Sequence, residues 1–337
     1  GYSSASTPPT DVGFGDGIHG ALTVDVTNTP KTIDDFRTKL TGDAAAGASS
    51  LTVYSTSGFA PGDEILIIEV QGVSGDYDST GKYEFRTIQS IGNGTLTITP
   101  VLTNAYSSTV TVGGVVDTMV QKVMHYTDVT VTHTLTGDDW ADSVGFGTTS
   151  QEGSIIAFRA TGTVALSGSG TISATGKGFR GGSAGASGKS GETYNGATDA
   201  CTGGVSAAGA TGTPSGGACG AGNSSAGAQS GTTGGAGGGG GEGATVGAGG
   251  GGAGHGTVGR SGQNTAGTAG NDGSGTTGGS GPSLGTEAEP GAGGGTYGAN
   301  TLSTLFIGSG GGGGAESTGT AGGDGGGLIF IAANMIT

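Results

Sequence analysis

Residues 237–241 read Gly-Gly-Gly-Gly-Gly and residues 249–252 read Gly-Gly-Gly-Gly, inside a segment from 168 to 326 built almost entirely from Gly, Ala, Ser and Thr. Glycine loses more backbone freedom on folding than any other residue. Such a segment therefore either stays disordered or folds by a packing rule that requires the missing side chain. The fold and the function both depend on which alternative holds.

A disordered tract is the usual state of a Gly- and Ser-rich sequence without a strict period. The other alternative is a bundle of polyglycine II helices, which lack internal hydrogen bonds and can therefore bond sideways to neighbouring helices. Glycine runs alternate here with short segments of larger residues, such as Thr257-Val258 and Pro282-Ser283-Leu284. These segments suit turns at the ends of a bundle, and we favour the bundle.

Composition excludes several classes of partner. The chain has 337 residues, of which 83 are Gly, and its 11 Lys and Arg against 26 Asp and Glu give a formal net charge of -15. Such a chain repels phosphate backbones and anionic membrane surfaces. No stretch approaches the roughly 20 apolar residues that cross a bilayer. We therefore expect no nucleic acid and no membrane insertion.

Two features indicate an exported protein. The chain begins at Gly1 rather than Met, which predicts a mature form whose signal segment has been removed. Its two cysteines, Cys201 and Cys219, lie in the Gly-rich region and are interpreted as one disulfide, with two free thiols as the alternative. The predicted location is extracellular, at the cell surface.

The flanks of the Gly-rich segment predict an all-β fold. Their short runs are apolar, β-branched or alternating, as in strands, and a hairpin is expected at Gly92-Asn93-Gly94. Glu64 to Val70 should be a central strand buried on both faces. Only Ile33 to Leu40 could form a short helical turn. The remaining expected strands are 21–26, 51–54, 83–91, 95–99, 110–116, 119–126, 129–132, 154–160, 162–166 and 170–174.

The end of the chain resembles an earlier segment. Residues 326–337 follow the same pattern as residues 153–164: Gly, an apolar strand, a small polar residue, then the start of another strand. We interpret this as an internal repeat, with the Gly-rich segment inserted between two strands of one apolar layer. Short strands separated by Gly corners suit the coils of a β-solenoid. The stretch 304–307, Thr-Leu-Phe-Ile, could seal the bundle against this base.

The predicted fold is thus an N-terminal β domain plus a small β-solenoid or sandwich base that carries a polyglycine II helix bundle. We expect four parts: an extended N-terminal arm at 1–20, a β domain at 21–126, a β base at 127–178 together with 327–337, and the bundle at 179–326.

Most motifs that could take part in catalysis or metal binding have a simpler explanation. Gly181-Gly182-Ser183-Ala184-Gly185 matches a nucleophile pattern, but no strand–turn–helix unit surrounds it. His19, His125, His133 and His255 lack the spacing of a metal site. We predict no catalytic, cofactor-binding or metal-binding residue and no enzyme. The one cofactor left open is Ca²⁺, on Asp138, Asp139 and Asp142 or on Asp76 and Asp78, against the alternative of solvated acidic loops.

Two further sets of residues are candidates for modification or binding. Asn93 and Asn223 stand in N-x-[ST] sequons and are candidate glycosylation sites. One turn segment of the predicted bundle is the candidate receptor-facing surface, with the residues His255, Val258, Arg260, Gln263 and Asn264.

The stretches SIIAFRATGTVALSGSGTISATGKGFRGG (154–182), GGDGGGLIFIAAN (322–334) and DAAAGASSLTVYSTSGFAPGDEILIIEVQG (43–72) resemble glycine-rich bacterial cell-surface proteins. The Gly-run part is similar to the tip adhesins of phage long tail fibres, and that resemblance implies a polyglycine II sandwich with receptor-binding loops at one end. Neither resemblance transfers a catalytic residue.

Our first interpretation is an extracellular structural protein that self-assembles into a filament, because the N-terminal arm is extended and the last strand leaves an unpaired edge. The alternative is a tip adhesin that binds a receptor protein or a glycan. A polysaccharide-active enzyme is a distant third. The expected partners are copies of the chain and a cell-surface glycan or protein.

Overall fold

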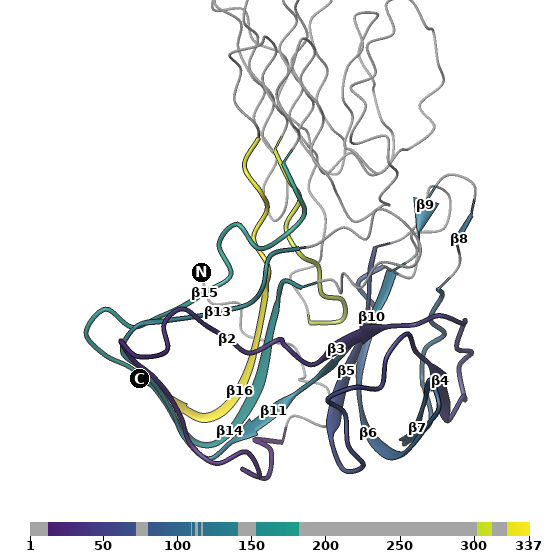
Figure 1. The fold of residues 1–337 in the computed structure, drawn as a ribbon, viewed down its shortest axis with the longest axis horizontal. Coiled ribbons are helices and arrows are strands. Elements are labelled where there is room, and N and C mark those ends of the chain that lie inside the picture. Colours follow the sequence, from purple (N-terminus) through teal and green to yellow (C-terminus); the bar gives the residue numbers. More distant parts are fainter. Residues whose placement is uncertain are drawn as a thin grey trace, which may run out of the picture.

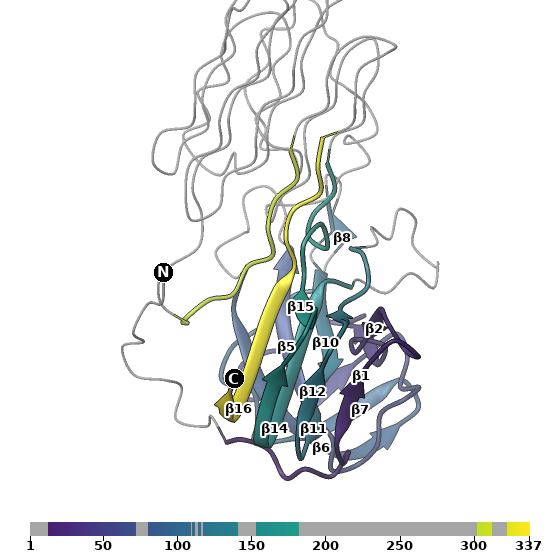
Figure 2. The ribbon, with the colours of Figure 1, turned by 90° about the vertical axis from the view of Figure 1, so that its left-hand side faces the viewer.

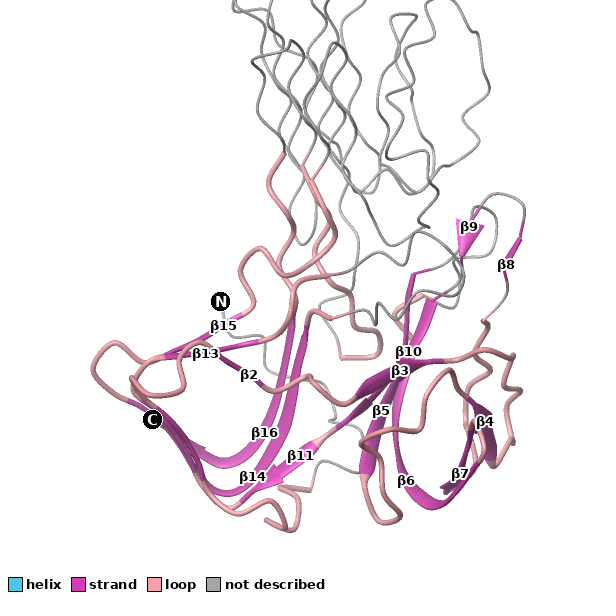
Figure 3. Ribbon diagram, viewed as in Figure 1, coloured by secondary structure: helices cyan, strands magenta, loops and turns pink. Residues whose placement is uncertain are grey.

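The computed structural model describes residues 13–71, 80–108, 110–111, 114–115, 117–140, 153–181, 302–311 and 322–337. Every regular element within these ranges is a β-strand, as Figure 3 shows, which confirms the predicted all-β fold. No helix in the described residues is long and apolar enough to cross a membrane. The segment from residue 33 to 40, where a helical turn was expected, contains a strand instead.

Six antiparallel strands form a closed barrel. Because Leu40 bridges Val53 and the Thr41 amide donates to the Thr52 carbonyl at 2.9 Å, the two outer strands join. Around the barrel the order is β3 (Arg37–Lys39), β10 (Asp117–Lys122), β5 (Glu64–Gln71), β6 (Tyr83–Gly92), β7 (Thr95–Thr99) and β4 (Ser50–Thr52).

Two elements of the barrel match their sequence signals. The strand β5 is buried on both faces, as its near-continuous apolar run predicted. The predicted hairpin joins β6 to β7 through Asn93 and Gly94, and Gly94 has a φ of 69°, which favours glycine. A separate short hairpin consists of β8 (Val110–Thr111) and β9 (Gly114–Val115).

Parallel strands form the second region, which we call the stack. Its main sheet consists of β1 (Leu22–Val24), β12 (Val129–Val131), β11 (Met124–Tyr126), β14 (Ile155–Leu166) and β16 (Leu328–Ile336). Figure 2 shows these strands side by side. A smaller parallel sheet consists of β2 (Lys31–Thr32), β13 (Thr134–Thr136) and β15 (Thr171–Ser173). The chain passes from the main to the smaller sheet three times, β1 to β2, β12 to β13 and β14 to β15, like successive coils of a solenoid.

The internal repeat predicts how β14 and β16 pair. Ile155 lies opposite Leu328, in the alignment given by the sequence pattern, and a register shift after Ala160 then brings Val164 opposite Ile336 instead of Thr337. The chain therefore leaves the stack after β15, where the Gly-rich insertion begins, and returns at β16, which lies beside β14. Both ends of the insertion are fixed to the stack, as Figure 1 shows.

The main sheet of the stack is the middle of three layers. One face packs against the barrel, where Ile155 and Ala157 of β14 meet Leu66, Ile68 and Met119. The other face packs against the smaller sheet, with Phe158 of β14 in a cluster that includes Val24, Val131 and Leu135. Because β14 is covered on both faces, its sequence is continuously apolar from residue 155 to 158.

The structure refines two expectations about the stack. The predicted strands 154–160 and 162–166 form one strand, β14, which continues through a register shift at Gly162. Gly162 lies beside Asp128, whose Oδ1 accepts a hydrogen bond from the Thr163 amide at 2.8 Å. The strands β1 and β2 come from residues 21 to 126 but pair with β12 and β13. The division of the chain into four parts stays a prediction.

Candidate functional site

Three chain segments meet where the Gly-rich insertion leaves the stack, and we call this place the glycine junction (residues 174–181, 305–311 and 322–327). Figure 1 shows the three segments rising together from the stack. Backbone hydrogen bonds join them in a cycle: Phe179 donates to Gly308 at 2.9 Å, Gly308 to Gly326 at 2.6 Å, and Gly325 to Phe179 at 2.8 Å. None of these residues belongs to a β-strand.

The segments of the glycine junction approach so closely that side chains would not fit between them. A Cβ built on Gly310 overlaps the Arg180 carbonyl, one on Gly325 overlaps the Gly308 carbonyl, and one on Gly181 overlaps the Gly322 carbonyl. Each obstacle is backbone, which cannot move aside as the end of a flexible side chain can. The junction is thus held by lateral backbone pairing between closely approaching glycine residues.

A small apolar cluster fixes the glycine junction to the rest of the protein. Phe179 is fully buried and meets Trp140 edge to face, with ring centroids 5.1 Å apart. Leu305 and Ile307 belong to the same cluster, and the Leu305 amide donates to Gly81 of the barrel at 2.8 Å. The stretch 304–307 therefore packs against the stack and the barrel, whereas its role in sealing a bundle stays a prediction.

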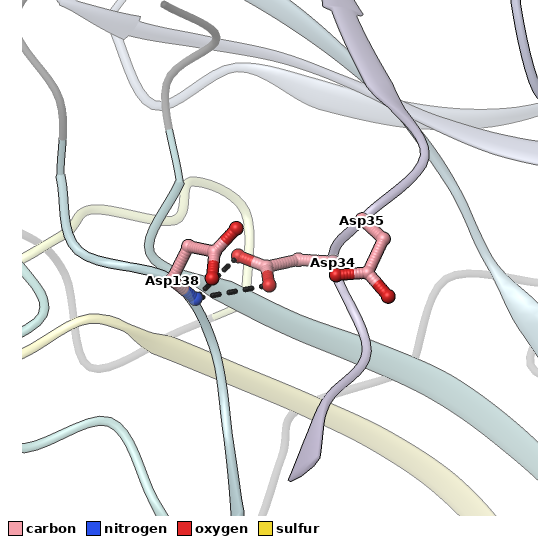
Figure 4. A group of neighbouring side chains, drawn as sticks. All are labelled: Asp34, Asp35 and Asp138. Carbon is pink, nitrogen blue, oxygen red and sulfur yellow. Dashed lines mark hydrogen bonds between the residues drawn. The ribbon is translucent and has the colours of Figure 1, made fainter. Parts of the chain in front are cut away.

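The acidic group near the junction differs from the predicted one. Asp138 lies beside Asp34 and Asp35, as Figure 4 shows. One carboxylate oxygen from each of the three lies within 4.8 Å of the others. Asp139 instead pairs with Lys177 at 2.6 Å. The other residues named for Ca²⁺, which are Asp142, Asp76 and Asp78, lie outside the described residues.

Protein groups already satisfy this acidic group. The Asp138 amide donates to both oxygens of Asp34, and Arg37 lies 2.9 Å from the Asp138 carboxylate. Burial raises the pKa of Asp34. A calcium ion takes six to eight oxygen ligands, whereas here Nη1 of Arg37 lies 2.9 Å from Asp138 and 3.6 Å from Asp34. The arrangement joins the segment after β2 to the end of β13.

Sequence reasoning missed a second polar group, the His125 cluster (Asp16, His19, Glu64, His125 and Arg159). Glu64 of the barrel accepts two hydrogen bonds from Arg159 of the stack, at 2.6 and 2.8 Å. The ring of His125 lies between Glu64 and Asp16, with its nitrogens 2.8 and 3.0 Å from their carboxylate oxygens. Spacing along the chain gives no signal for this cluster, because its members come from four separate segments.

The environment shifts the titration of this cluster. Burial opposes ionisation of Glu64, but the hydrogen bonds and charges of His125 and Arg159 outweigh it and hold the pKa of Glu64 below its usual value. The same partnership with Glu64 and Asp16 raises the pKa of His125 despite its desolvation. Burial and the positive charge of Lys122 lower the pKa of His19.

Most of the residues that the sequence singled out lie outside the described residues. These are the candidate receptor-facing residues His255, Val258, Arg260, Gln263 and Asn264, the cysteines Cys201 and Cys219, and the sequon Asn223. The other sequon, Asn93, is exposed in the hairpin turn.

Three solved structures of phage tailspikes are similar to part of this chain. The first is the gp54 tailspike of Acinetobacter baumannii bacteriophage AP22 in complex with Acinetobacter baumannii capsular saccharide, with 15% identity, a TM-score of 0.23, and coverage of 39% of this chain and 21% of that one. The second is the tailspike gp61 of Pseudomonas phage phi297, with 20% identity, a TM-score of 0.22, and coverage of 39% of this chain and 20% of that one. The third is the tailspike gp49 of Pseudomonas phage LKA1, with 13% identity, a TM-score of 0.20, and coverage of 41% of this chain and 22% of that one. The chain spans about a fifth of the length of these tailspikes. No protein-family model and no curated protein matches it.

The comparison corrects one expectation. The sequence predicted that the chain is not an enzyme, and this prediction is contradicted because the matched structures are tailspikes, one of them holding a saccharide. The prediction had used the lack of a recognisable motif. A motif along the chain is a poor guide in a fold that assembles its polar groups from distant segments.

Proposed function

We propose that this protein is an extracellular adhesin, whose β base presents the Gly-rich insertion as a polyglycine II bundle to a saccharide or protein on a bacterial surface. The glycine junction carries this proposal. Backbone pairing at both ends of the insertion supports a stiff projection rather than a tether, because closely packed glycine segments cannot swing independently.

The proposed binding surface is the turn segment with His255, Val258, Arg260, Gln263 and Asn264. A glycine lattice offers no side chains of its own, so side-chain recognition must come from the turns that connect its helices. Arginine and amide side chains suit hydroxyl-rich ligands, since both supply several hydrogen bonds in a fixed geometry. Bacterial capsular saccharide is the ligand class to test first, because the AP22 tailspike is described with one.

The test is binding of the purified full chain to a panel of bacterial capsular polysaccharides and to the cells that carry them. Arg260→Ala and Gln263→Ala should each weaken binding by roughly tenfold, as expected for a central polar contact. Gln89→Ala, on an exposed position of the barrel strand β6, is the matched control and should bind as the original chain does. Each bound polysaccharide is sized afterwards, which tells retention from cleavage.

Two outcomes decide the proposal. If the original chain retains no polysaccharide and no cell, the adhesin function is wrong. If it binds but the loop variants equal the Gln89→Ala control, another surface binds the ligand.

A second candidate function is self-assembly into a surface filament, and the stack supports it. Within the described residues, β1 and β16 each have one unpaired edge, at opposite ends of one parallel sheet. Open parallel edges favour addition of a strand from another subunit. Head-to-tail contacts of this kind do not close and extend into a filament.

Electron microscopy of the purified chain distinguishes this candidate from the first. The filament hypothesis predicts polymers, and it predicts that deletion of residues 1–15 abolishes them. Single particles from the original chain, or unchanged filaments from the shortened one, would contradict it.

A further inference from the structure

The N-terminal segment of residues 13–20, which we call the arm, lies against the edge of β11. The His19 amide donates to the His125 carbonyl at 2.9 Å, and the Thr127 amide donates to the Gly20 carbonyl at 2.8 Å. Arg159 also reaches the Gly13 carbonyl, at 2.5 Å. Gly15 has a φ of 81°, and a Cβ there would come within 2.9 Å of the His125 ring. The arm is therefore fitted to this histidine.

The ring of His125 faces a carboxylate at each nitrogen. Nδ1 lies 3.0 Å from Asp16 in the arm, and Nε2 lies 2.8 Å from Glu64 in the barrel. A neutral imidazole carries one N–H, so only the doubly protonated ring can donate to both carboxylates. With His125 charged, two cations and two anions balance in the cluster, because Arg159 also pairs with Glu64.

His19 requires the opposite protonation state. Its Nδ1 lies 2.9 Å from the His125 backbone nitrogen, which can only donate. The same nitrogen lies 3.3 Å from the His125 carbonyl, a longer contact that a protonated Nδ1 could use. We assign the shorter contact, in which Nδ1 accepts and the His19 ring is neutral. Lys122 lies near enough to disfavour a second positive charge here. One histidine of the contact thus has to be charged and the other neutral.

We propose that the arm is a pH-gated latch, closed while His125 is protonated and His19 is neutral, and opened on both the alkaline and the acid side of neutral pH. On the alkaline side, His125 loses its donor to Asp16, and the 3.4 Å approach of the Asp16 amide to Nδ1 is a weak substitute. On the acid side, His19 loses the lone pair that accepts the His125 amide. The proposal stands independently of the adhesin function.

The pKa shifts agree with these signs. His125, with its pKa raised, stabilises the arm fully below the ordinary histidine value of about 6.5, and this contribution disappears as the pH rises through the folded value. His19, with its pKa lowered, contributes above about 6.5 and stops as the pH falls through its folded value. The charged and titratable groups that face the two rings are Asp16 from the arm, Asp63, Glu64 and Lys122 from the barrel, Tyr126 from β11, and Arg159 from β14. Asp63 and Lys122 form an ion pair with each other at 2.9 Å.

Hydrogen exchange of the full chain, followed by mass spectrometry from about pH 5 to about pH 9, tests the latch. Exchange rates are divided by the intrinsic rate at each pH, and a peptide covering residues 13–22 is compared with one from β5. We expect protection of the arm peptide to be greatest near neutral pH and to fall roughly tenfold on each side, while β5 stays protected. A flat profile for the arm between these limits would overturn the proposal.

Two conservative variants separate the two sides of this profile. His19→Asn keeps an acceptor where Nδ1 lies but does not titrate, so it should remove the acid fall and leave the alkaline one. Asp16→Asn, at an exposed position, removes the charged partner of His125 and should remove the alkaline fall while keeping the pair with Glu64. His133→Asn, at a histidine outside the cluster, is the control and should leave both. The latch would also be overturned if His19→Asn and Asp16→Asn each kept both the acid and the alkaline fall in protection of the arm peptide at their original size.

Discussion

The barrel and the stack solve the same problem of strand edges in opposite ways. The barrel closes on itself between β3 and β4, so each of its six strands has two neighbours. The stack adds parallel strands one after another and leaves an open edge at β1 and at β16 within the described residues. Closure removes unpaired backbone groups, whereas an open parallel stack keeps a template for another strand.

The difference explains where a long insertion can be accommodated. In the barrel, the connection from β6 to β7 is a two-residue hairpin. In the stack, β14 and β16 pair although the whole Gly-rich segment of residues 168–326 lies between them in the sequence. The entropic cost of closing a loop grows only slowly with its length, so the register depends on the apolar layer rather than on the length of the insertion.

The largest expected effect comes from removing the centre of the stack. Phe158→Ala should lower the free energy of unfolding by about 3–5 kcal/mol, because the ring is fully buried between the two parallel sheets and leaves a cavity. Chemical denaturation measures this change. Phe14→Ala, at a phenylalanine that is 45% exposed, is the control and should change stability by less than about 0.5 kcal/mol. An equal loss in the two variants would mean that the stack has no specific core at Phe158.

The contact between barrel and stack should be the next most sensitive. Glu64→Gln leaves the Arg159 guanidinium, 2% exposed, without its carboxylate and should cost about 3 kcal/mol. The pKa of Glu64 is depressed, so its contribution is present above the ordinary value of about 4.3 and is lost as the pH falls through the folded value. The difference between the original chain and the variant should therefore shrink in acid. Denaturation at neutral and acid pH measures it, and a difference independent of pH would contradict the assignment.

The glycine junction allows a matched pair of substitutions two residues apart. Gly325→Ala places a methyl group on the Gly308 backbone and should cost about 1–3 kcal/mol, whereas Gly323→Ala meets nothing within 4 Å and should be close to neutral. The stabilities of the two variants are compared by thermal unfolding. If both variants behave alike, close backbone packing does not hold the insertion to its base.

Much of this fold could be predicted from the sequence, because local patterns determine it. The apolar run of β5, the Asn93-Gly94 hairpin and the repeat that pairs β14 with β16 are all readable along the chain. The closure of the barrel could not be predicted, since it depends on a bridge between Leu40 and Val53 that no short motif encodes. The strands β1 and β2 likewise reveal their partners only in three dimensions.

The polar groups were the least predictable part. From the sequence, His125 was only one of four histidines without metal-site spacing, because its partners Asp16, Glu64 and Arg159 are distant in the sequence. Asp138 was grouped with its neighbours in the chain, yet it lies with Asp34 and Asp35. In a fold made of stacked coils, residues that share a site come from successive coils, so proximity along the chain misleads.

The smallest effect on stability should come from the open edge of the stack, and it sharpens the contrast with the closed barrel. Met335 and Ile336 of β16 are 51% and 59% exposed, so Met335→Lys should change the free energy of unfolding by less than about 0.5 kcal/mol. A charge on an edge strand opposes pairing with another chain, so the same variant should reduce any self-association that sedimentation detects. Thr97→Lys in the barrel strand β7, which has neighbours on both sides, is the comparison and should leave association unchanged. If the two lysines affect association equally, general charge repulsion and not the open edge of β16 governs contact between copies.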